Sequence, residues 1–235
     1  FAGDDRIVGD YVRDEFLSAL SPARLAFLTR SSILGVLTGP LCDAVLERRG
    51  SAKVLEELQR SNSLVIPLDR TEGRYRYHHL LAELLANELH RREPEIGPEL
   101  HVRASDWYAA NSDIPSAVEH AIAANDVPRA GELIWHAFPE MSGRGRMATL
   151  GRWLDQLGSE AVASSVPVTL SRAHYHLVLG EGDGAAGCAK LAEELGPSPG
   201  GSPVSYEADL HNLRATLAAD GALAMGAEAE RASEL

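Results

Sequence analysis

The chain has 235 residues and carries 22 Lys and Arg side chains against 34 Asp and Glu, a formal net charge of −12. Hydrophobic residues make up 45% of it, an ordinary value for a globular protein that buries a core. The acidic balance argues against a protein that wraps nucleic acid over its whole surface, because phosphates are neutralised by clustered Lys and Arg. Residues 1–95 hold 13 basic and 15 acidic side chains, net −2, whereas residues 96–235 hold 9 and 19, net −10. We therefore expect two parts with different roles.

Cys42 and Cys188 are the two cysteines of the chain and lie far apart in sequence. They supply neither a disulfide framework nor a cysteine-based zinc site, so we expect both to be small buried residues in a reducing compartment. No apolar run approaches the roughly 20 residues of a membrane-spanning helix, and no signal peptide starts at Phe1. We expect a cytoplasmic protein without membrane contact. The two ends suggest an internal part of a longer protein.

Helical periodicity dominates the chain up to residue 62. Four successive helices are expected to start, in chain order, at Asp10, at Ser21-Pro22, at Thr38-Gly39-Pro40 and at Ser51. Gly50 is expected to end the third of them. We expect the first of these helices over residues 11–20 and the last to be capped by Ser51 and to end near Asn62. Each has apolar residues at helical intervals.

A short β-hairpin is expected next, because the hydrophobic period changes. Residues 64–68 and 74–77 flank a polar turn that contains Gly73, and Pro67 indicates an edge or a marginal strand. An amphipathic helix follows and stops before Pro94. Three short helices, a two-stranded wing and a closing helix are the order of elements in a winged-helix domain. The predicted fold class is therefore mainly α, with a winged helix first.

From about residue 98 the pattern indicates one helix after another, typical of a helix-turn-helix solenoid. A loose repeat, in which Asp follows a small residue and precedes Ala by three or four positions, occurs at Asp126, Asp183 and Asp220. The last two are 37 positions apart, near the ~34-residue period of tetratricopeptide-like repeats. We expect such an Asp to cap the second helix of a pair. Residues 196–203, rich in Gly, Pro and Ser, are expected to form a loop between helices.

The chain contains no catalytic or nucleotide-binding motif in the sequence context that such a motif requires. The run from Gly182 through Gly184 to Gly187 satisfies the dinucleotide fingerprint G-x-G-x-x-G, but helical spacing precedes it and no βαβ pattern surrounds it. We therefore expect an inter-helix turn there. The sequence has no P-loop, no H-E-x-x-H zinc motif and no nucleophile elbow. We expect the chain itself to be no enzyme and to hold no metal and no cofactor.

His78 and His79 stand at the expected junction between the hairpin and the following helix. A helix N-terminus presents unpaired N–H groups and the positive end of its dipole, so an imidazole beside it can help to bind an anion. The alternative is that one histidine caps the helix and the other packs beneath the wing.

The third short helix of the winged-helix domain, residues 52–61, is the element that would read DNA in a DNA-binding winged helix. Its Lys53 and Arg60 are balanced by Glu56 and Glu57, and it offers no cluster of Asn and Arg for base contacts. We therefore expect packing against protein and no direct nucleic-acid contact through this helix.

Six blocks of sequence, in one order, resemble the middle of the MalT-like, large ATP-binding LuxR-type transcriptional regulators of bacteria. The blocks are Asp10-Tyr11-Val, Leu25-Ala-Phe-Leu-Thr-Arg-Ser-Ser-Ile-Leu34, Leu41-Cys-Asp-Ala-Val-Leu46, Tyr75-Arg-Tyr-His-His-Leu-Leu81, Leu100-His-Val-Arg-Ala-Ser-Asp-Trp107 and Ala117-Val-Glu-His-Ala-Ile-Ala-Ala-Asn-Asp126. The resemblance covers residues 5–160 well, and the remainder by its helix-repeat pattern.

The resemblance implies a multi-domain signal-transduction ATPase of which this chain is the middle. The implied domains are the end of the helical region after an ATPase core (1–20), a winged helix (21–95), a helical arm (96–164) and the start of a tetratricopeptide-like sensor (165–235). The implied partners are the ATPase domain of the same parent and a small-molecule or protein effector at the sensor. ATP and ADP are expected in the parent, which is also expected to self-associate when active.

The resemblance gives His78 a role, since a His at the wing-to-helix junction contacts the ADP phosphates in this wider class of NTPases. The sequence departs from the class at His79, where many relatives have Asp. The implied function is regulatory: to couple nucleotide state and effector binding to a DNA-binding activity outside this chain. The alternative is an interaction module of another signalling protein, such as a protein kinase, without nucleotide contact.

Overall fold

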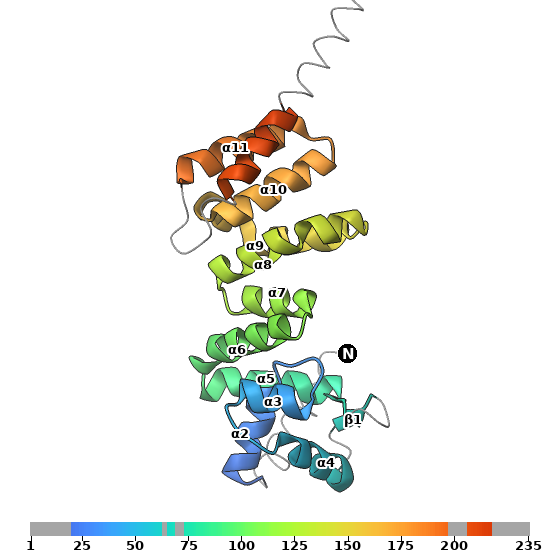
Figure 1. Cartoon of the computed structure of the whole chain (residues 1–235). Coiled ribbons are helices and arrows are strands. Elements are labelled where there is room, and N and C mark those ends of the chain that lie inside the picture. Colours follow the sequence, from blue (N-terminus) through green and yellow to red (C-terminus); the bar gives the residue numbers. More distant parts are fainter. Residues whose placement is uncertain (1–19, 63–64, 69–72, 197–205, 218–235) are drawn as a thin grey trace, which may run out of the picture. The chain divides into compact units, whose positions relative to one another are not determined.

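The computed structural model describes residues 20–62, 65–68, 73–196 and 206–217 (Figure 1). These residues are mostly helical and include a two-stranded antiparallel sheet, which confirms the mainly α fold class. The chain separates into two compact units, residues 1–124 and 125–235. The expected helix 11–20, residues 197–203 of the expected loop and Asp220 lie outside the described residues. The domain boundaries at residues 20, 95 and 164 stay predictions.

The first unit contains the expected winged helix followed by a helix pair. Its elements are α2 (Pro22–Ser31), α3 (Gly39–Val45), α4 (Ser51–Asn62), β1 (Val65–Pro67), β2 (Tyr75–Tyr77), α5 (His79–Arg92), α6 (Ile96–Ala110) and α7 (Ile114–Ala123). In the wing, Val65 pairs with Tyr77 and Pro67 with Tyr75. Tyr75 also exchanges both backbone hydrogen bonds with Leu37, at 2.7 and 2.9 Å. The wing is thus tied to the segment before α3.

The starts of α2 and α3 follow local sequence signals. The side chains of Ser21 and Thr38 accept hydrogen bonds from the backbone N–H groups of Arg24 and Leu41, at 3.3 and 3.2 Å, and each helix has a proline in its first turn. The predicted cap at Ser21 is confirmed, and Thr38 caps α3 at the place where a helix start was expected.

The start of α4 differs from the prediction. Ser51 is the first residue of the helix and not its cap. The Asp43 carboxylate, from α3, accepts hydrogen bonds from the backbone N–H groups of Gly50 and Ser51, at 3.2 and 2.9 Å. Gly50 turns the chain with φ +87°, a conformation that glycine adopts without steric cost. The cap of α4 is therefore supplied by the preceding helix.

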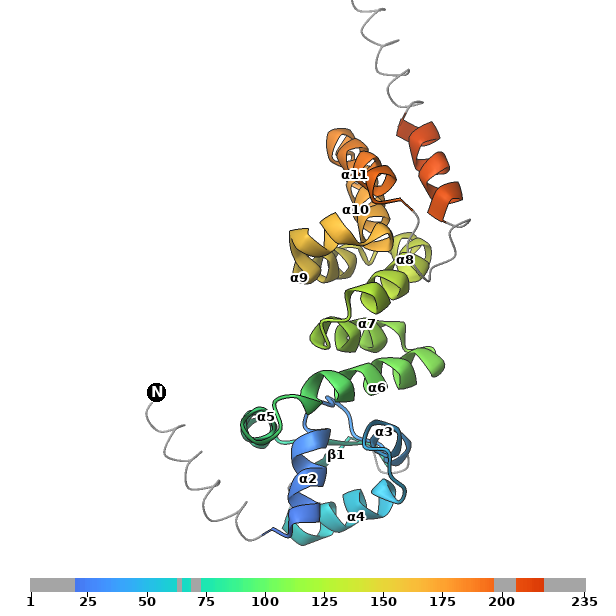
Figure 2. The ribbon, with the colours of Figure 1, turned by 90° about the vertical axis from the view of Figure 1, so that its left-hand side faces the viewer.

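The core of the winged helix is built from leucines and two tyrosines of the wing. In β2 the side chains of Tyr75 and Tyr77 are buried, whereas Arg76 between them is exposed. α5, seen almost end-on in Figure 2, lies beside α2. The fully buried apolar residues of this part include Leu28, Leu37, Leu41, Cys42, Val45, Leu55 and Leu85. The prediction that Cys42 is buried is confirmed, whereas Cys188 is half-buried.

Two neighbouring turns share one local motif. Asp113 caps α7 and Asp126 caps the next helix, each accepting from the backbone N–H three residues on. The residue before each Asp is left-handed, Ser112 with φ +61° and Asn125 with φ +56°. Asp126 therefore fulfils its predicted role, and Asp113 was missed. Asp183 does not have the predicted capping role, because it lies inside the first turn of a helix that has no side-chain cap.

The second unit consists of helices. They are α8 (Val127–Gly143), α9 (Met147–Ser164), α10 (Val166–Val178), α11 (Gly182–Leu195) and a helix over residues 206–217. α9 is broken at Gly158, where φ is +78°. The glycines of the G-x-G-x-x-G run lie in α11, so the expected inter-helix turn is wrong for them, and the turn itself is residues 179–181.

The second unit has an apolar core of its own. Trp153 is fully buried with Ile134, and α10 is covered by α11 and the helix over residues 206–217. The buried cluster on α10 and its neighbours comprises Val166, Leu170, Ala173, Ala189, Ala192, Tyr206 and Leu213. No helix in the described part of the chain combines the length and the apolar character needed to cross a bilayer.

Candidate functional site

The junction between β2 and α5 is held from within by Tyr77. Its side chain is buried, and its hydroxyl lies 2.8 Å from the Ser31 hydroxyl on α2. Ser31 in turn donates to the Phe27 carbonyl at 2.6 Å. Burial raises the pKa of the Tyr77 hydroxyl, which stays protonated. The residue that follows, His78, is therefore projected from an anchored point.

His78 precedes the first residue of α5 and has extended backbone angles, φ −60° and ψ 139°. Its side chain makes no capping hydrogen bond, and the side chains of both His78 and His79 are exposed. The two rings are neighbours, with centroids 4.5 Å apart and planes tilted by 37°. The alternative in which one histidine caps the helix and the other packs beneath the wing is therefore wrong.

A hollow of about 230 Å³ lies at this junction, between the wing and the start of α5. It is lined by Ile66, Arg76, Tyr77, His78 and His79. The first backbone N–H groups of an α-helix have no partner within the helix, and the dipole there favours negative charge. A guanidinium and two imidazoles beside such a helix end are donors suited to an anion.

Arg76 was missed as a member of this site. The signal that could have found it is strand alternation, because residues two apart on a strand share a face. The buried Tyr75 and Tyr77 on one face imply that Arg76 projects from the other, toward solvent, as the structure shows. The structure brings it to the same hollow as His78.

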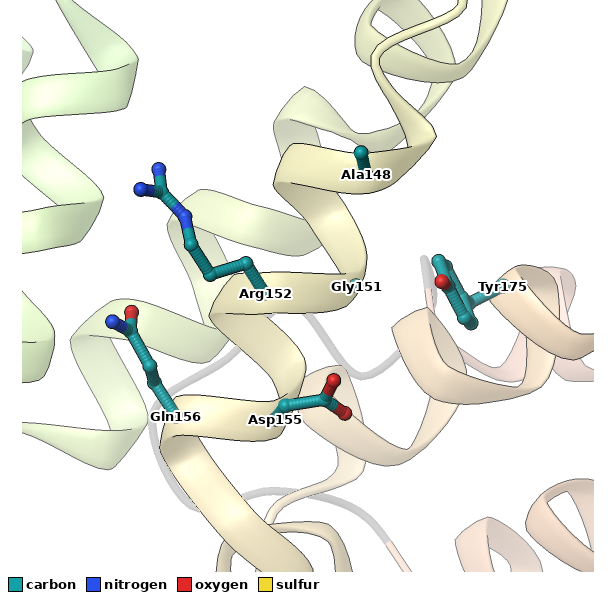
Figure 3. Close-up of a pocket in the computed structure, with 6 residues that line it drawn as sticks. All are labelled: Ala148, Gly151, Arg152, Asp155, Gln156 and Tyr175. Carbon is teal, nitrogen blue, oxygen red and sulfur yellow. The ribbon is translucent and has the colours of Figure 1, made fainter.

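A larger hollow, of about 490 Å³, lies between α9 and α10 in the second unit. Gly151 allows Tyr175 to approach α9, because a Cβ at Gly151 would lie 2.4 Å from the Tyr175 hydroxyl. Figure 3 shows that Arg152 and Gln156 point away from Tyr175. Asp155 forms an ion pair with Arg172 at 2.9 Å. The polar side chains that line this hollow do not point toward a common centre, so we do not take it as the functional site.

The exposed face of α4 is electrically balanced. Arg60 forms an ion pair with Glu56 at 3.3 Å, and Glu57 lies 3.6 Å from Arg24 of α2. Lys53 is exposed on the same helix. Among the described residues, no group of three or more His, Cys, Asp or Glu is placed to hold a metal ion.

The order of the short helices, the wing and α5 identifies the first part of the chain, and comparison with known families agrees with it. Residues 13–96 match the family model described as the MalT winged helix domain. Residues 13–96 thus resemble the MalT winged helix domain. His78 and its hollow lie within the matched residues, at the start of their last helix, α5.

Known proteins of two kinds resemble the chain. It is 26% identical over 178 residues to the serine/threonine-protein kinase PknK of Mycobacterium tuberculosis, covering 76% of this chain. It is 26% identical over 164 residues, 70% of this chain, to the HTH-type transcriptional regulator MalT of Vibrio campbellii. The corresponding regulator MalT of Yersinia pestis is 29% identical over 132 residues, 56% of this chain.

These alignments occupy a small part of each relative. The chain spans 16% of the length of PknK and 18% and 15% of the two MalT proteins. The resemblance to MalT-like regulators therefore concerns the winged helix and the helices after it. The aligned lengths exceed the 84 positions of the matched domain, so the likeness continues beyond residue 96.

Proposed function

We propose that this chain is the regulatory middle of a multi-domain, ATP-dependent transcriptional regulator. It couples nucleotide state and effector binding to a DNA-binding activity carried outside the chain. The match of residues 13–96 to the MalT winged helix supports this, together with the similarity to HTH-type regulators. The parent ATPase domain is then the intramolecular partner of the winged helix, and the whole acts in the cytoplasm.

The observation that carries the nucleotide part of the proposal is the exposed, uncapped His78 at the mouth of its hollow. The His78 side chain neither caps α5 nor packs beneath the wing, so it is available to bind a ligand. Arg76 and the N-terminus of α5 surround it with donors. In our proposal the phosphates of ADP, bound by the ATPase domain proposed for the parent, contact His78 and hold the resting arrangement. ATP replaces that contact and shifts the population to the active one.

The test uses the complete protein with its ATPase domain. We expect His78→Ala to weaken ADP binding by about tenfold, equivalent to about 1.4 kcal/mol, and to raise activity without effector. The matched control is His90→Ala, another exposed histidine on α5 but at its far end. Equal ADP affinity and equal basal activity for His78→Ala and the unchanged protein would contradict the proposal.

The helices of the second unit are proposed to receive the effector. Stacked helix pairs offer extended surfaces suited to small molecules or proteins. No nucleic acid is proposed to bind through this chain, and the charge balance of α4 supports that. The parent is proposed to self-associate when active. The chain itself is proposed to be no enzyme.

The alternative is a module that regulates a protein kinase, without nucleotide contact. The observation in its favour is that the likeness to PknK extends over 178 residues, against 164 for MalT of Vibrio campbellii. Sequencing the gene on both sides of this segment separates the two. A Walker A lysine upstream and a basic helix-turn-helix downstream support the regulator, whereas a kinase domain supports the alternative.

A further inference from the structure

A third hollow, of about 410 Å³, lies within the second unit among α8, α10 and the helix over residues 206–217. Its size is in the range of small-molecule cavities. Its apolar wall is formed by Trp135, Phe138, Pro139 and Val178. Val178 is 52% exposed, so the hollow opens to solvent on the α10 side.

A carboxylate is fixed at the polar end of this hollow. Asp209 accepts a hydrogen bond from the Trp135 indole N–H at 2.9 Å. The His174 Nε2 atom lies 2.9 and 3.0 Å from the two Asp209 oxygens and donates to them. Three helices thus meet at one side chain, and the carboxylate cannot turn away from the hollow.

The Asp209 carboxylate has acceptor capacity left. It offers about four lone-pair sites, whereas two N–H donors are bound to it. Burial opposes its ionisation, but hydrogen bonds from His174 and Trp135 outweigh burial and lower the pKa of the carboxyl. Its side chain is 21% exposed. It is therefore an anion that faces a partly open cavity.

Among the described residues that line this hollow, the basic side chains are His136 and His174, and His174 is paired with Asp209. None of the described residues that line the hollow is Lys or Arg. The aromatic ring of Trp135 packs edge-on against Tyr206, with centroids 4.6 Å apart and planes at 68°. Aromatic faces beside a carboxylate attract a cation through both charge and the ring quadrupole.

We propose that this hollow binds an organic cation, an ammonium or guanidinium group on a short apolar body. The apolar body lies against Phe138 and Val178, and the cationic head reaches Asp209. Anions are disfavoured by the carboxylate, and a bare metal ion finds a single carboxylate there. The two sources of such a cation are a free amine and an arginine side chain of a partner protein. The inference rests on the proposed effector role of this unit for its regulatory meaning.

The Trp135 indole N–H is a direct reporter, because it is bonded to Asp209. We would follow its NMR signal, assigned with Trp135→Phe, in the 235-residue chain. The probes are 2-phenylethylammonium, its neutral isostere 2-phenylethanol, and a short glycine-flanked arginine peptide. We expect the signal to shift and to saturate as either cation is added. The neutral isostere should bind at least tenfold more weakly than 2-phenylethylammonium. Tighter binding of the amine indicates a free ligand, and tighter binding of the peptide indicates a protein partner.

Asp209→Asn keeps an acceptor oxygen and removes the charge, so we expect it to weaken cation binding at least tenfold. Glu207→Gln, an exposed position on the same helix, removes the same charge and should leave binding unchanged. No saturable shift with either cation, or equal binding of the neutral isostere, would overturn the proposal. The comparison of the charged probes with the neutral isostere is made on the unmodified chain, so it does not depend on whether a variant folds. It is also independent of ADP binding by the complete protein, so each proposal fails by itself.

Discussion

The hydroxyl oxygens of Tyr77 and Ser31 lie 2.8 Å apart inside the winged helix and join the wing to α2 across 46 positions of sequence. The Ser31 hydrogen is directed to the Phe27 carbonyl, 2.6 Å away, so Tyr77 is the donor of the pair. Both residues are buried. This hydrogen bond fixes the strand residue directly before His78, and through it the position of the candidate anion site.

Removal of this hydrogen bond should destabilise the winged helix. We expect Tyr77→Phe to lower the free energy of unfolding by about 1 kcal/mol, the usual net value of a buried hydrogen bond. The measurement is urea unfolding followed by circular dichroism. A double-mutant cycle with Ser31→Ala isolates the pair, and a coupling energy near zero would show that the two hydroxyls do not interact.

The cap that Asp43 supplies to α4 makes a second prediction. Burial opposes ionisation of Asp43, but hydrogen bonds from Ser51 and Gly50 outweigh it and lower the pKa of the carboxyl. We expect Asp43→Ala to cost about 1–2 kcal/mol of stability, as loss of a helix cap does. Asp43→Asn retains an acceptor and should cost less. The two variants are compared by urea unfolding at neutral pH, and equal losses would mean that the hydrogen bonds are not the cause.

The sequence predicted the elements well where the signals are local. Ser21 and Thr38 lie three residues from the N–H groups that they cap, so a short window contains both partners. The cap of α4 joins residues seven and eight positions apart through two helices, which no local rule covers. The sequence favours Ser51 as the cap because it has a capping side chain at the expected helix boundary.

The candidate sites show the same division. His78 was found because its place, between a strand pattern and a helix pattern, is visible in the sequence. The cavity at Asp209 is not visible in the sequence, because Trp135 and His174, the partners of Asp209, are 74 and 35 positions away from it. Such a site depends on how helices pack, and helical periodicity alone does not contain that information.

The contact between α8 and α10 makes a third prediction. Gly131 is buried on α8, and a Cβ there would lie 2.8 Å from the Val168 methyl carbon Cγ2 and 3.2 Å from Pro167. We expect Gly131→Ala to lower stability by about 1–2 kcal/mol, because overpacking outweighs the better helix propensity of alanine.

The matched control for Gly131 is Gly187→Ala, in the interior of α11. Among the described residues, no atom outside its own helix backbone lies within 4 Å of the position of that Cβ. Alanine there should raise stability by up to about 1 kcal/mol. Thermal unfolding of both variants therefore should give shifts of opposite sign. A stabilised Gly131→Ala would mean that α8 and α10 do not pack as closely as in this structure.

The fourth prediction concerns the histidine pair between α6 and α7. The Nδ1 atoms of His101 and His120 lie 2.8 Å apart, and the His120 ring stacks on Tyr108. Burial, with a smaller contribution from His101, lowers the pKa of His120 to about 4, and burial also lowers that of His101. Folding thus favours the neutral rings, since one Nδ1 must donate and the other accept.

The sign of the pH dependence follows from proton binding. The unfolded chain takes up a proton at each histidine near pH 6.5, whereas folded His120 does so near pH 4. The unfolded state therefore binds more protons in this range, and stability is complete above about pH 6.5 and falls as the pH falls toward 4. We expect a loss of about 2–3 kcal/mol from His120 alone over that interval.

Urea unfolding at several pH values between 7 and about 4.5 measures this loss. His120→Leu removes the titrating group and should flatten the curve, whatever its effect on stability at pH 7. His211→Gln removes an exposed histidine and should leave the slope unchanged. If the slope of His120→Leu equals that of the unmodified chain, the acid sensitivity arises elsewhere and the pair of His101 and His120 is not its source.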